Sequence, residues 1–355
     1  MSHDVSTVKL KLLALQVLRV RDGVILKRGC SEFRIIGAGA AEIIPILIRK
    51  MEGALVTTEE LCGFFPSTDR PVVKEFVSRL IQARLLVACE GIQPAHTQPE
   101  TNLDIFYWHF GSSAQETGRQ LNSHRIVIQG VNGISRQLVI ALTNSGWEDV
   151  VVVDEPSLRN LSFFDPTGKL IFDNWHQNHK PPIDPEQWAN KSEMTSSDCL
   201  VATSDVGPLE AMRRWNEYSV QQFCHFFPIV LRNGTGYIGP LVVPGETACY
   251  ECLRSRQNAN MDDPESARAT EAFVFEEQRQ HVSGCHPSMA SVLGDIAGME
   301  LTKFYSGLLP WPNVGSLVEI NLLIPSLHVR RVLKIPRCIV CNPINRRPSK
   351  SPFRT

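Results

Sequence analysis

The chain has 355 residues, of which 43% are hydrophobic and 21% are charged, and its formal net charge at pH 7 is −1. This length suits two or three domains with complete hydrophobic cores, and the near-neutral charge argues against nucleic acid or an anionic membrane as a partner. No apolar stretch approaches the roughly 20 residues that span a bilayer. The apolar run 10–18 lacks the cleavage site of a signal peptide, so we expect a cytoplasmic protein.

Residues 1–90 are predicted to form a small winged-helix-like module. Asp22-Gly23 is a hairpin signal between two β-like runs. Thr57 with Glu60 has the pattern of a capping box, and Pro71 suits the first turn of a helix. The predicted strands are 17–20, 24–27 and 32–36, and the predicted helices are 40–51, a short helix after Thr57 and a third helix that opens at 69–71.

A winged-helix module often binds DNA, so a transcriptional regulator is one alternative. The third predicted helix carries Lys74, Glu75, Arg79 and Arg84. This is a mixed set of charges and not a basic stripe, which disfavours recognition of nucleic acid.

Residues 91–123 are predicted to connect this module to a second unit. The stretch 91–102 contains Gly91, Pro94 and Pro99 and is typical of a linker. A helix is expected to follow over about 104–121. The second unit then comprises residues 124–355.

The second unit opens with a pattern that is typical of nucleotide-binding α/β folds. A buried strand at 125–129 runs into Gly130 and Gly133, which precede a predicted helix. The next strand is apolar and ends at Asp154, but Arg136 occupies the position of the third glycine of the dinucleotide motif. Further predicted strands are 199–203 (followed by Asp205), 227–231, 237–243, 318–323 and 327–333, and further predicted helices are 134–144, 209–220 and 286–305.

Two Cys-x-x-Cys pairs carry the most specific chemistry in the sequence. Each pair, Cys249 with Cys252 and Cys338 with Cys341, is predicted to lie in a short polar turn, where its two sulfurs can face one point. Four thiolates make a closed tetrahedral zinc site that leaves no position for a substrate, so we expect a structural zinc ion. A redox Cys-x-x-Cys is the weaker alternative, because it would need only one pair near the start of a βαβ unit.

The remaining cysteines and two histidines give weaker signals. Cys30, Cys62, Cys89, Cys199, Cys224 and Cys285 are irregularly spaced and are predicted to be mostly buried free thiols of a reducing compartment. Cys285 beside His286 could act as a nucleophile, although a lone cysteine near a helix start is more often structural. His176 and His179 lack a third ligand and are expected to lie in an exposed loop.

The residues from 120 to 345 resemble the ubiquitin-activating-enzyme superfamily, which includes the ThiF and MoeB adenylating enzymes. The resemblance rests on the Gly130 to Gly133 loop, Asp154, Asp205 and the two cysteine pairs, with Gly239-Pro240 and the following residues before the first pair. With the N-terminal module included, the chain resembles ThiF-like proteins of azole-forming ribosomal peptide pathways (thiazole/oxazole-modified microcins and thiopeptides). The fold class that this implies is α/β, with a winged-helix-like module before a Rossmann-like ThiF-type domain.

The resemblance implies that the N-terminal module is a peptide recognition element. In that family the leader of a precursor peptide adds as a β-strand between the third strand and the third helix, and the body docks a YcaO-type cyclodehydratase that uses the ATP. Relatives of the superfamily pair through the body, so a homodimer is expected. The residues expected to bind the leader are Phe33, Arg34, Ile35, Ile36, Val73, Lys74, Phe76, Val77, Leu80 and Arg84.

The same resemblance implies a degenerate nucleotide site. Active adenylating members have an Asn-x-x-Arg-Gln run whose Arg meets the triphosphate, whereas here Asn160 is followed by Leu161, Ser162, Phe163 and Phe164. A phosphate clamp needs cationic forks and close backbone approach. The vestigial nucleotide residues are Gly130, Gly133, Asp154, Asn160 and Asp205, and we expect no ATP in this chain.

The sequence therefore predicts an accessory subunit, with no catalytic residues assigned, that captures a leader and presents the core peptide for azoline formation at Cys, Ser or Thr. The alternative is an autonomous ATP-dependent adenylating enzyme of the ThiF or MoeB type.

Overall fold

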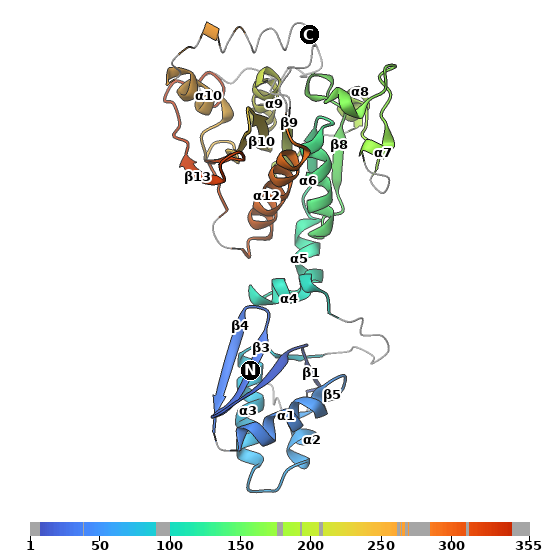
Figure 1. The fold of residues 1–355 in the computed structure, drawn as a ribbon, viewed down its shortest axis with the longest axis vertical. Helices are drawn as coiled ribbons and strands as arrows, with labels where there is room; N and C mark the ends of the chain where they lie inside the picture. Colours follow the sequence, from blue (N-terminus) through green and yellow to red (C-terminus); the bar gives the residue numbers. More distant parts are fainter. Residues whose placement is uncertain are drawn as a thin grey trace. The chain divides into compact units, whose positions relative to one another are not determined.

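The computed structural model describes residues 8–342 except 38, 90–99, 176–179, 192–193, 206–208, 261–262, 264, 267–268, 270–284 and 310–311. The chain divides into two compact units, residues 1–113 and 114–355. Figure 1 draws both units and labels their elements. The helix that follows the predicted linker, α4 (Asn102–His109), belongs to the first unit.

The first unit contains two three-stranded antiparallel sheets. One has the order β2-β3-β4, in which Val20 pairs with Gly23 across the predicted Asp22-Gly23 turn. The other has the order β5-β1-β6. Sequence patterns did not predict this second sheet, because its strands are only two or three residues long. The strands are β1 (Leu10–Leu12), β2 (Gln16–Val20), β3 (Gly23–Arg28), β4 (Ser31–Ile36), β5 (Leu55–Val56) and β6 (Leu86–Ala88).

Three helices cover these sheets at the predicted positions: α1 (Ala40–Met51), α2 (Thr58–Gly63) and α3 (Arg70–Gln82). The Thr57 hydroxyl accepts a hydrogen bond from the Glu60 N–H, and the Glu60 carboxylate accepts one from the Thr57 N–H, which is the predicted capping box. Helix α4 closes the unit, since the Trp108 indole N–H donates to the Arg84 carbonyl at 2.8 Å. The structure contains this mixed α/β unit, and its assignment to the winged-helix class stays a prediction.

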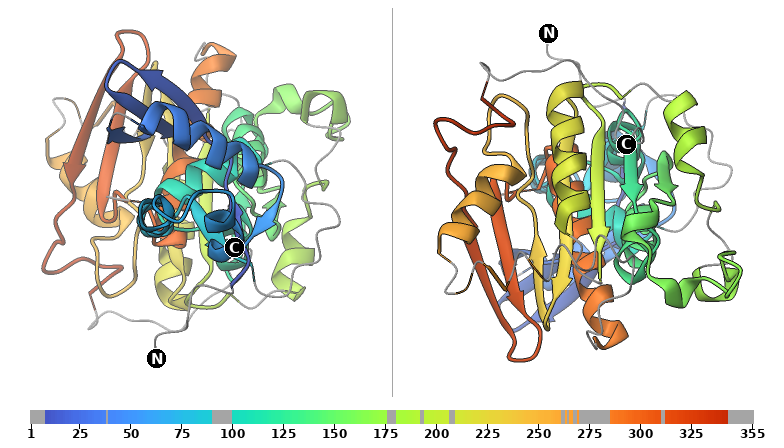
Figure 2. Two further views of the ribbon diagram at one scale, coloured as in Figure 1. Left: turned by 90° about the horizontal axis from the view of Figure 1, so that it is seen from below. Right: turned by 90° about the horizontal axis from the view of Figure 1, so that it is seen from above.

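The second unit is built on a seven-stranded mixed sheet with the order β13-β12-β11-β10-β9-β7-β8. The four strands from β10 to β8 are parallel, and β11, β12 and β13 extend the sheet in antiparallel fashion. Figure 2 shows these strands side by side. The strands are β7 (Ile126–Gln129), β8 (Val150–Val153), β9 (Cys199–Ser204), β10 (His225–Arg232), β11 (Thr235–Ile238), β12 (Ser316–Asn321) and β13 (Ser326–Arg331).

Helices cover both faces of this sheet, as the Rossmann-like prediction requires. Alternate strand residues belong to two separate cores: Ile126 and Ile128 pack with α6 and α12, whereas Val127 packs with α9 and α10. A Cβ at Gly294 of α12 would approach the Leu138 N atom of α6 to 2.8 Å, so glycine permits the close packing of these two helices. The described helices are α5 (Ala114–Leu121), α6 (Gly133–Asn144), α7 (Phe172–Trp175), α8 (Pro185–Lys191), α9 (Leu209–Gln222), α10 (Tyr250–Ala259) and α12 (Pro287–Ser306), with short 3₁₀ turns at Pro156–Leu158 and Leu161–Phe163.

Two predicted elements, one helix and one strand, are interrupted or cut short in the structure. The helix expected over 104–121 is broken into α4 and α5, because Gly111 between them has a φ of 94°, a conformation that favours glycine and ends a helix. The strand expected over 237–243 ends at Ile238, directly before Gly239-Pro240. Among the described residues, no helix is long and apolar enough to cross a membrane.

Candidate functional site

The four predicted cysteines lie together in the second unit. The Sγ atoms of Cys249, Cys252, Cys338 and Cys341 are all within 4.8 Å of one another. Cys249 lies 3.9 Å from Cys252 and 3.6 Å from Cys338, and Cys252 lies 3.6 Å from Cys341. Thiolates at about 2.3 Å from a tetrahedral zinc ion would be separated by about 3.8 Å. The donor set and its spacing therefore fit a metal ion such as zinc.

The prediction that the first cysteine pair lies in a short polar turn is wrong. The pair lies at the start of α10. Cys249 is the N-cap residue and Cys252 lies in the first helical turn. The Ile335 N–H donates to the Cys252 sulfur at 3.4 Å. A hydrogen bond from an N–H group stabilises the thiolate form of a cysteine, which is the form that ligates a metal.

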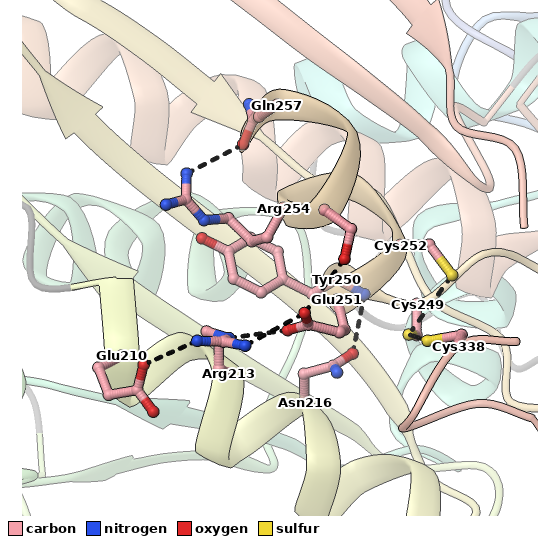
Figure 3. Close-up of polar contacts among 11 residues, drawn as sticks. Glu210, Arg213, Asn216, Cys249, Tyr250, Glu251, Cys252, Arg254, Gln257 and Cys338 are labelled. Atoms are coloured by element: carbon pink, nitrogen blue, oxygen red, sulfur yellow. Dashed lines mark hydrogen bonds and ion pairs between the residues drawn. The ribbon is translucent and has the colours of Figure 1, made fainter. Parts of the chain in front are cut away.

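Helix α9 holds α10 in place beside the cysteines, as Figure 3 shows. The Arg213 guanidinium donates to both carboxylate oxygens of Glu251, at 2.7 and 3.1 Å, and this hydrogen bonding to Glu251 raises the pKa of Arg213. The Asn216 side-chain oxygen accepts the Tyr250 N–H at 2.9 Å. Two helices and the second cysteine turn thus fix the position of the cluster, which supports a structural role.

The predicted nucleotide residues come together where β7, β8 and β9 end. The first turn of α6 is closed by the chain's own side chains. The Asp205 carboxylate accepts the Gly133 N–H at 2.9 Å, and the Asn132 side-chain oxygen accepts the N–H groups of Ile134 and Ser135 at 3.1 and 3.0 Å. These are the N–H groups that hold a phosphate at the start of a helix in nucleotide-binding folds. Asn160, another predicted nucleotide residue, lies beside the same carboxylate: its side-chain amide donates a hydrogen bond to Asp205 at 3.0 Å.

The two glycines of this loop have packing roles. Gly130 has a φ of 101°, and a Cβ there would lie 2.7 Å from the Leu158 Cβ. A Cβ at Gly133 would lie 3.0 Å from the Ala290 Cβ of α12. The fold therefore requires glycine at position 130, whether or not a phosphate binds, and a larger residue at position 133 would press against α12.

Asp205 and Asp154 are both engaged. Asp205 is only 4% exposed, and burial raises the pKa of its carboxyl group. Asp154, which stands where the resemblance implies a ribose partner, binds Arg159 through two hydrogen bonds of 2.6 and 2.8 Å. Arg159 was not singled out in the sequence, although it lies directly before Asn160.

Phe163 and Phe164, which stand where active adenylating members have Arg-Gln, are buried in the core of the unit. The Phe163 ring contacts Trp175 with centroids 6.2 Å apart. The closure of the α6 N-terminus therefore comes from Asp205 and Asn132, with the two rings contributing to the hydrophobic core.

A groove of about 750 Å³ lies in the first unit, between β4 on one side and α1 and α3 on the other. Its apolar floor comes from both sides and includes Phe33, Ile35, Ile43 and Phe76. Among the described residues, β4 pairs only with β3, so its other edge has no strand partner. The groove thus combines an unpaired strand edge with apolar side chains.

The residues expected to bind a leader fall into two groups. Most line this groove, and three do not: Val77 is in the core, Lys74 is exposed away from the lining, and Arg84 lies in the turn after α3. The predicted residues that line the groove are Phe33, Arg34, Ile35, Ile36, Val73, Phe76 and Leu80. The Arg34 guanidinium is already bound to Asp22, at 2.9 and 3.1 Å.

Two further elements of the groove wall, α1 and one side of α3, are not among the residues predicted from the sequence. Ile43 of α1 lines the groove, and so do Val72, Glu75 and Arg79 of α3. Glu75 and Arg79 form an exposed ion pair of 2.8 Å. Positions 72, 75, 79 and 83 share one helical face, but helical spacing alone does not distinguish a groove wall from a solvent-exposed face.

The remaining candidates have weaker positions. All ten cysteines are free thiols, and Cys62, Cys199 and Cys224 are buried as predicted, but Cys30 and Cys285 are exposed. The Cys285 and His286 pair lies at the start of α12, where the His286 side chain accepts the Ser288 N–H. The predicted positions of His176 and His179 lie outside the described residues.

Comparisons with known proteins show the fold. A structure described as a heterocyclase in complex with substrate and cofactor is similar to this chain with a TM-score of 0.59 and 15% identity, and the match covers 94% of this chain and 39% of that one. The heterocyclase TruD matches with a TM-score of 0.59 and 16% identity, over 94% and 43% of the two chains. E. coli MccB with MccA-N7isoASN matches with a TM-score of 0.59 and 17% identity, over 94% and 99%.

The chain therefore spans less than half of the two heterocyclase chains and nearly the whole of MccB. No protein-family model matches the sequence, and no curated protein matches it. At these identities the likeness shows a shared fold.

Proposed function

We propose that this chain binds the leader of a ribosomally made precursor peptide and presents the peptide to a YcaO-type cyclodehydratase for azoline formation at Cys, Ser or Thr. The leader lies as an added strand against β4, within the groove that α3 and α1 close. The chain itself is an accessory subunit in this account, and its partner carries out the cyclodehydration.

The groove beside β4 is the observation that carries the proposal. Peptide capture by strand addition needs an unpaired edge for main-chain hydrogen bonds and apolar pockets for alternate side chains. The β4 edge supplies the first requirement, and Phe33, Ile35, Ile43 and Phe76 supply the second. The mixed charges of Glu75 and Arg79 at its rim suit a peptide better than a nucleic acid backbone.

The comparisons support the same pathway. The fold is similar to that of two heterocyclases, one of which was solved with substrate and cofactor, and to that of MccB solved with MccA-N7isoASN. We further propose that the four cysteines hold a structural zinc ion and that the body forms a homodimer. Sedimentation across micromolar concentrations measures the second point, and a monomer throughout would contradict it.

The competing function is that of an autonomous adenylating enzyme, which the similarity to MccB solved with ATP favours. The closed first turn of α6 argues against it, since Asp205 and Asn132 already occupy the N–H groups that would bind a phosphate. We expect no ATP–pyrophosphate exchange by the isolated chain. Exchange that is lost in Asn160→Ala would restore adenylation as the function.

Two isoleucines of α1 provide the test of the proposed leader site. Ile43 lines the groove, whereas Ile46, on the same helix, is 53% exposed and does not line it. Ile43→Asp should weaken binding of the cognate leader by about tenfold or more, because it places a charge against the apolar part of the bound strand. Ile46→Asp should leave the affinity unchanged.

Fluorescence polarisation with a labelled leader measures both variants. The leader is taken from a short Cys/Ser/Thr-rich reading frame, which a search of the genes around this one has to locate first. Melting curves show whether each variant is folded. Equal affinities of the two folded variants would place the peptide site elsewhere.

A further inference from the structure

A second cavity, of about 460 Å³, lies on one face of the antiparallel end of the sheet in the second unit. Its floor follows from strand pairing: Val230 lies opposite Tyr237, and Tyr237 lies opposite Glu319. Residues that are directly opposite on neighbouring strands share a face of the sheet. The next row along the same face includes Leu317 opposite Arg330.

Helix α10 supplies the opposite wall of this cavity. Tyr250, Leu253, Arg254 and Gln257 all line it, and their spacing of three or four residues places them on one helical face. Figure 3 shows the Tyr250 and Arg254 side chains on α10 together with Gln257. The start of this helix is fixed by Cys249 and Cys252, so the cysteine cluster also sets the position of the wall.

The charge of this cavity distinguishes it from the rest of the chain. Among its described lining residues are five arginines, a single carboxylate (Glu319) and no lysine, in a chain whose formal net charge is −1. Arginine is the cation that binds phosphate through a planar fork, whereas lysine is a strongly hydrated point charge. The arginines are Arg232, Arg254, Arg256, Arg330 and Arg331.

Several of these guanidinium groups are held in position. The Arg256 Nε–H donates to the Leu333 carbonyl at 3.0 Å, Arg254 donates to the Gln257 side chain at 3.2 Å, and Arg330 pairs with Glu319 at 3.0 Å. Arg254 is only 6% exposed. Cations from the helix and from the sheet are thus fixed around one cavity, which lowers the entropy lost when a ligand binds.

We propose that this arginine-lined cavity binds a small molecule that carries a diphosphate group. Arg331 leaves β13 on the opposite face of the sheet from Arg330. The other four arginines and one glutamate leave three positive charges, and a terminal diphosphate carries about three negative charges. The phenol rings of Tyr237 and Tyr250 and the side chains of Leu253 and Leu317 offer contacts to the remainder of the molecule.

The dimensions of the cavity favour a diphosphate over an acidic peptide. Residues 250–260 of the wall span about 15 Å of helix. An extended peptide presents a side chain to one face only about every 6.8 Å. The carboxylates of an acidic peptide would therefore be spaced more widely than the arginines of the cavity. The site is separate from the N-terminus of α6, and the proposal of a diphosphate ligand does not depend on the proposed leader site.

Calorimetric titration of the full chain with inorganic pyrophosphate tests the proposal, and ADP in a second titration shows whether a nucleoside adds affinity. We expect one site per chain. Arg330 is 62% exposed at its side chain and Arg331 is also exposed, so Arg330→Gln/Arg331→Gln should fold and should raise Kd at least about tenfold. Arg79→Gln, in the first unit, should not change Kd.

Metal content is measured before and after each titration, because pyrophosphate also binds divalent cations. A single Arg330→Gln variant serves if the double variant does not fold, because Arg330 lies on the cavity face of β13. No binding of pyrophosphate or ADP at millimolar concentration would overturn the proposal. Binding that is unchanged in the arginine variants but lost in Asn160→Ala would also overturn it, and so would arginine-dependent binding of a polyglutamate peptide in the absence of any pyrophosphate binding.

Discussion

The N-terminus of α6 and the groove beside β4 are both places where a chain of this fold could bind a ligand. They differ in whether the chain itself supplies the hydrogen-bonding partners. At α6 the N–H groups of Gly133, Ile134 and Ser135 donate to Asp205 and Asn132 of the same chain. At β4 the outer strand edge has no strand partner among the described residues, and apolar side chains lie beside it.

The difference indicates where the chain needs an external partner. Buried polar groups are costly when they are unpaired, so a helix start that the chain satisfies itself gains little from a ligand. A strand edge and an exposed apolar groove gain hydrogen bonds and buried area when a peptide is added. Loss of nucleotide binding and retention of peptide binding are the functional consequences that we propose.

The largest expected effect comes from removing one sulfur ligand from the cysteine cluster in the second unit, where four Sγ atoms lie within 4.8 Å of one another. Cys338→Ser removes one of four ligands, and we expect loss of the bound metal and a fall of roughly 10 °C or more in the melting temperature of this unit. A loss of about 3–5 kcal/mol would produce such a shift in a unit of this size. Elemental analysis and calorimetry measure the two quantities.

The matched control is Cys30→Ser, since Cys30 is an exposed thiol of the first unit. It should change neither metal content nor melting. Wild-type protein purified without chelator and free of metal would contradict the account of the cluster.

The next effect concerns the carboxylate that closes α6. Burial raises the pKa of Asp205 in the folded protein, so the folded state holds this proton more tightly than the unfolded state does. Its contribution to stability is complete below the unfolded pKa and is lost as the pH rises through the folded pKa. Asp205→Asn keeps an oxygen acceptor for Gly133 and removes the titration.

We therefore expect the free energy of unfolding of Asp205→Asn to increase relative to that of the wild type as the pH rises from 4 to 7. Urea unfolding at a series of pH values measures this difference. A difference that stays constant over the whole range would show that folding does not raise the pKa of Asp205.

A smaller effect distinguishes two faces of α3. Arg79 lines the groove and Lys74 does not, so Arg79→Glu should change leader affinity by about 1 kcal/mol or more, whereas Lys74→Glu should not. The two variants carry the same change of charge on the same helix. A larger effect at Lys74 would show that the leader occupies a different side of α3.

The smallest effect is expected at Arg34. Its ion pair with Asp22 is exposed, with 57% and 47% of the two side chains accessible, and such pairs contribute little to stability. Arg34→Gln should leave the melting temperature unchanged. It should also alter leader affinity less than Arg79→Glu does, because Arg34→Gln removes one charge whereas Arg79→Glu reverses one. Side-by-side polarisation and melting measurements check both points.

Local signals predicted much of this fold. Asp22-Gly23 located the first hairpin, Thr57 with Glu60 located the start of α2, and the spacing of four cysteines identified the cluster that could hold a metal ion. In each case the information lies within a few residues or in a residue type with few alternatives.

Features that depend on distant contacts could not be predicted. Asp205 reaches Gly133 across 72 residues of sequence, and no local pattern records that contact. On α3, the groove wall that contains Val72 and Arg79 lies next to the core stripe of Val73 and Leu80. Periodicity identifies the core stripe but does not separate a groove wall from an ordinary solvent-exposed face.

The central claim is that the leader adds to the edge of β4, and hydrogen–deuterium exchange tests it most directly. The same sheet offers an internal control, because β2 forms its other edge. On addition of the cognate leader, backbone exchange over Ser31–Ile36 should slow, and exchange over Gln16–Val20 should stay unchanged. Unaltered exchange at β4 with saturating leader, or equal protection of both edges, would contradict the account.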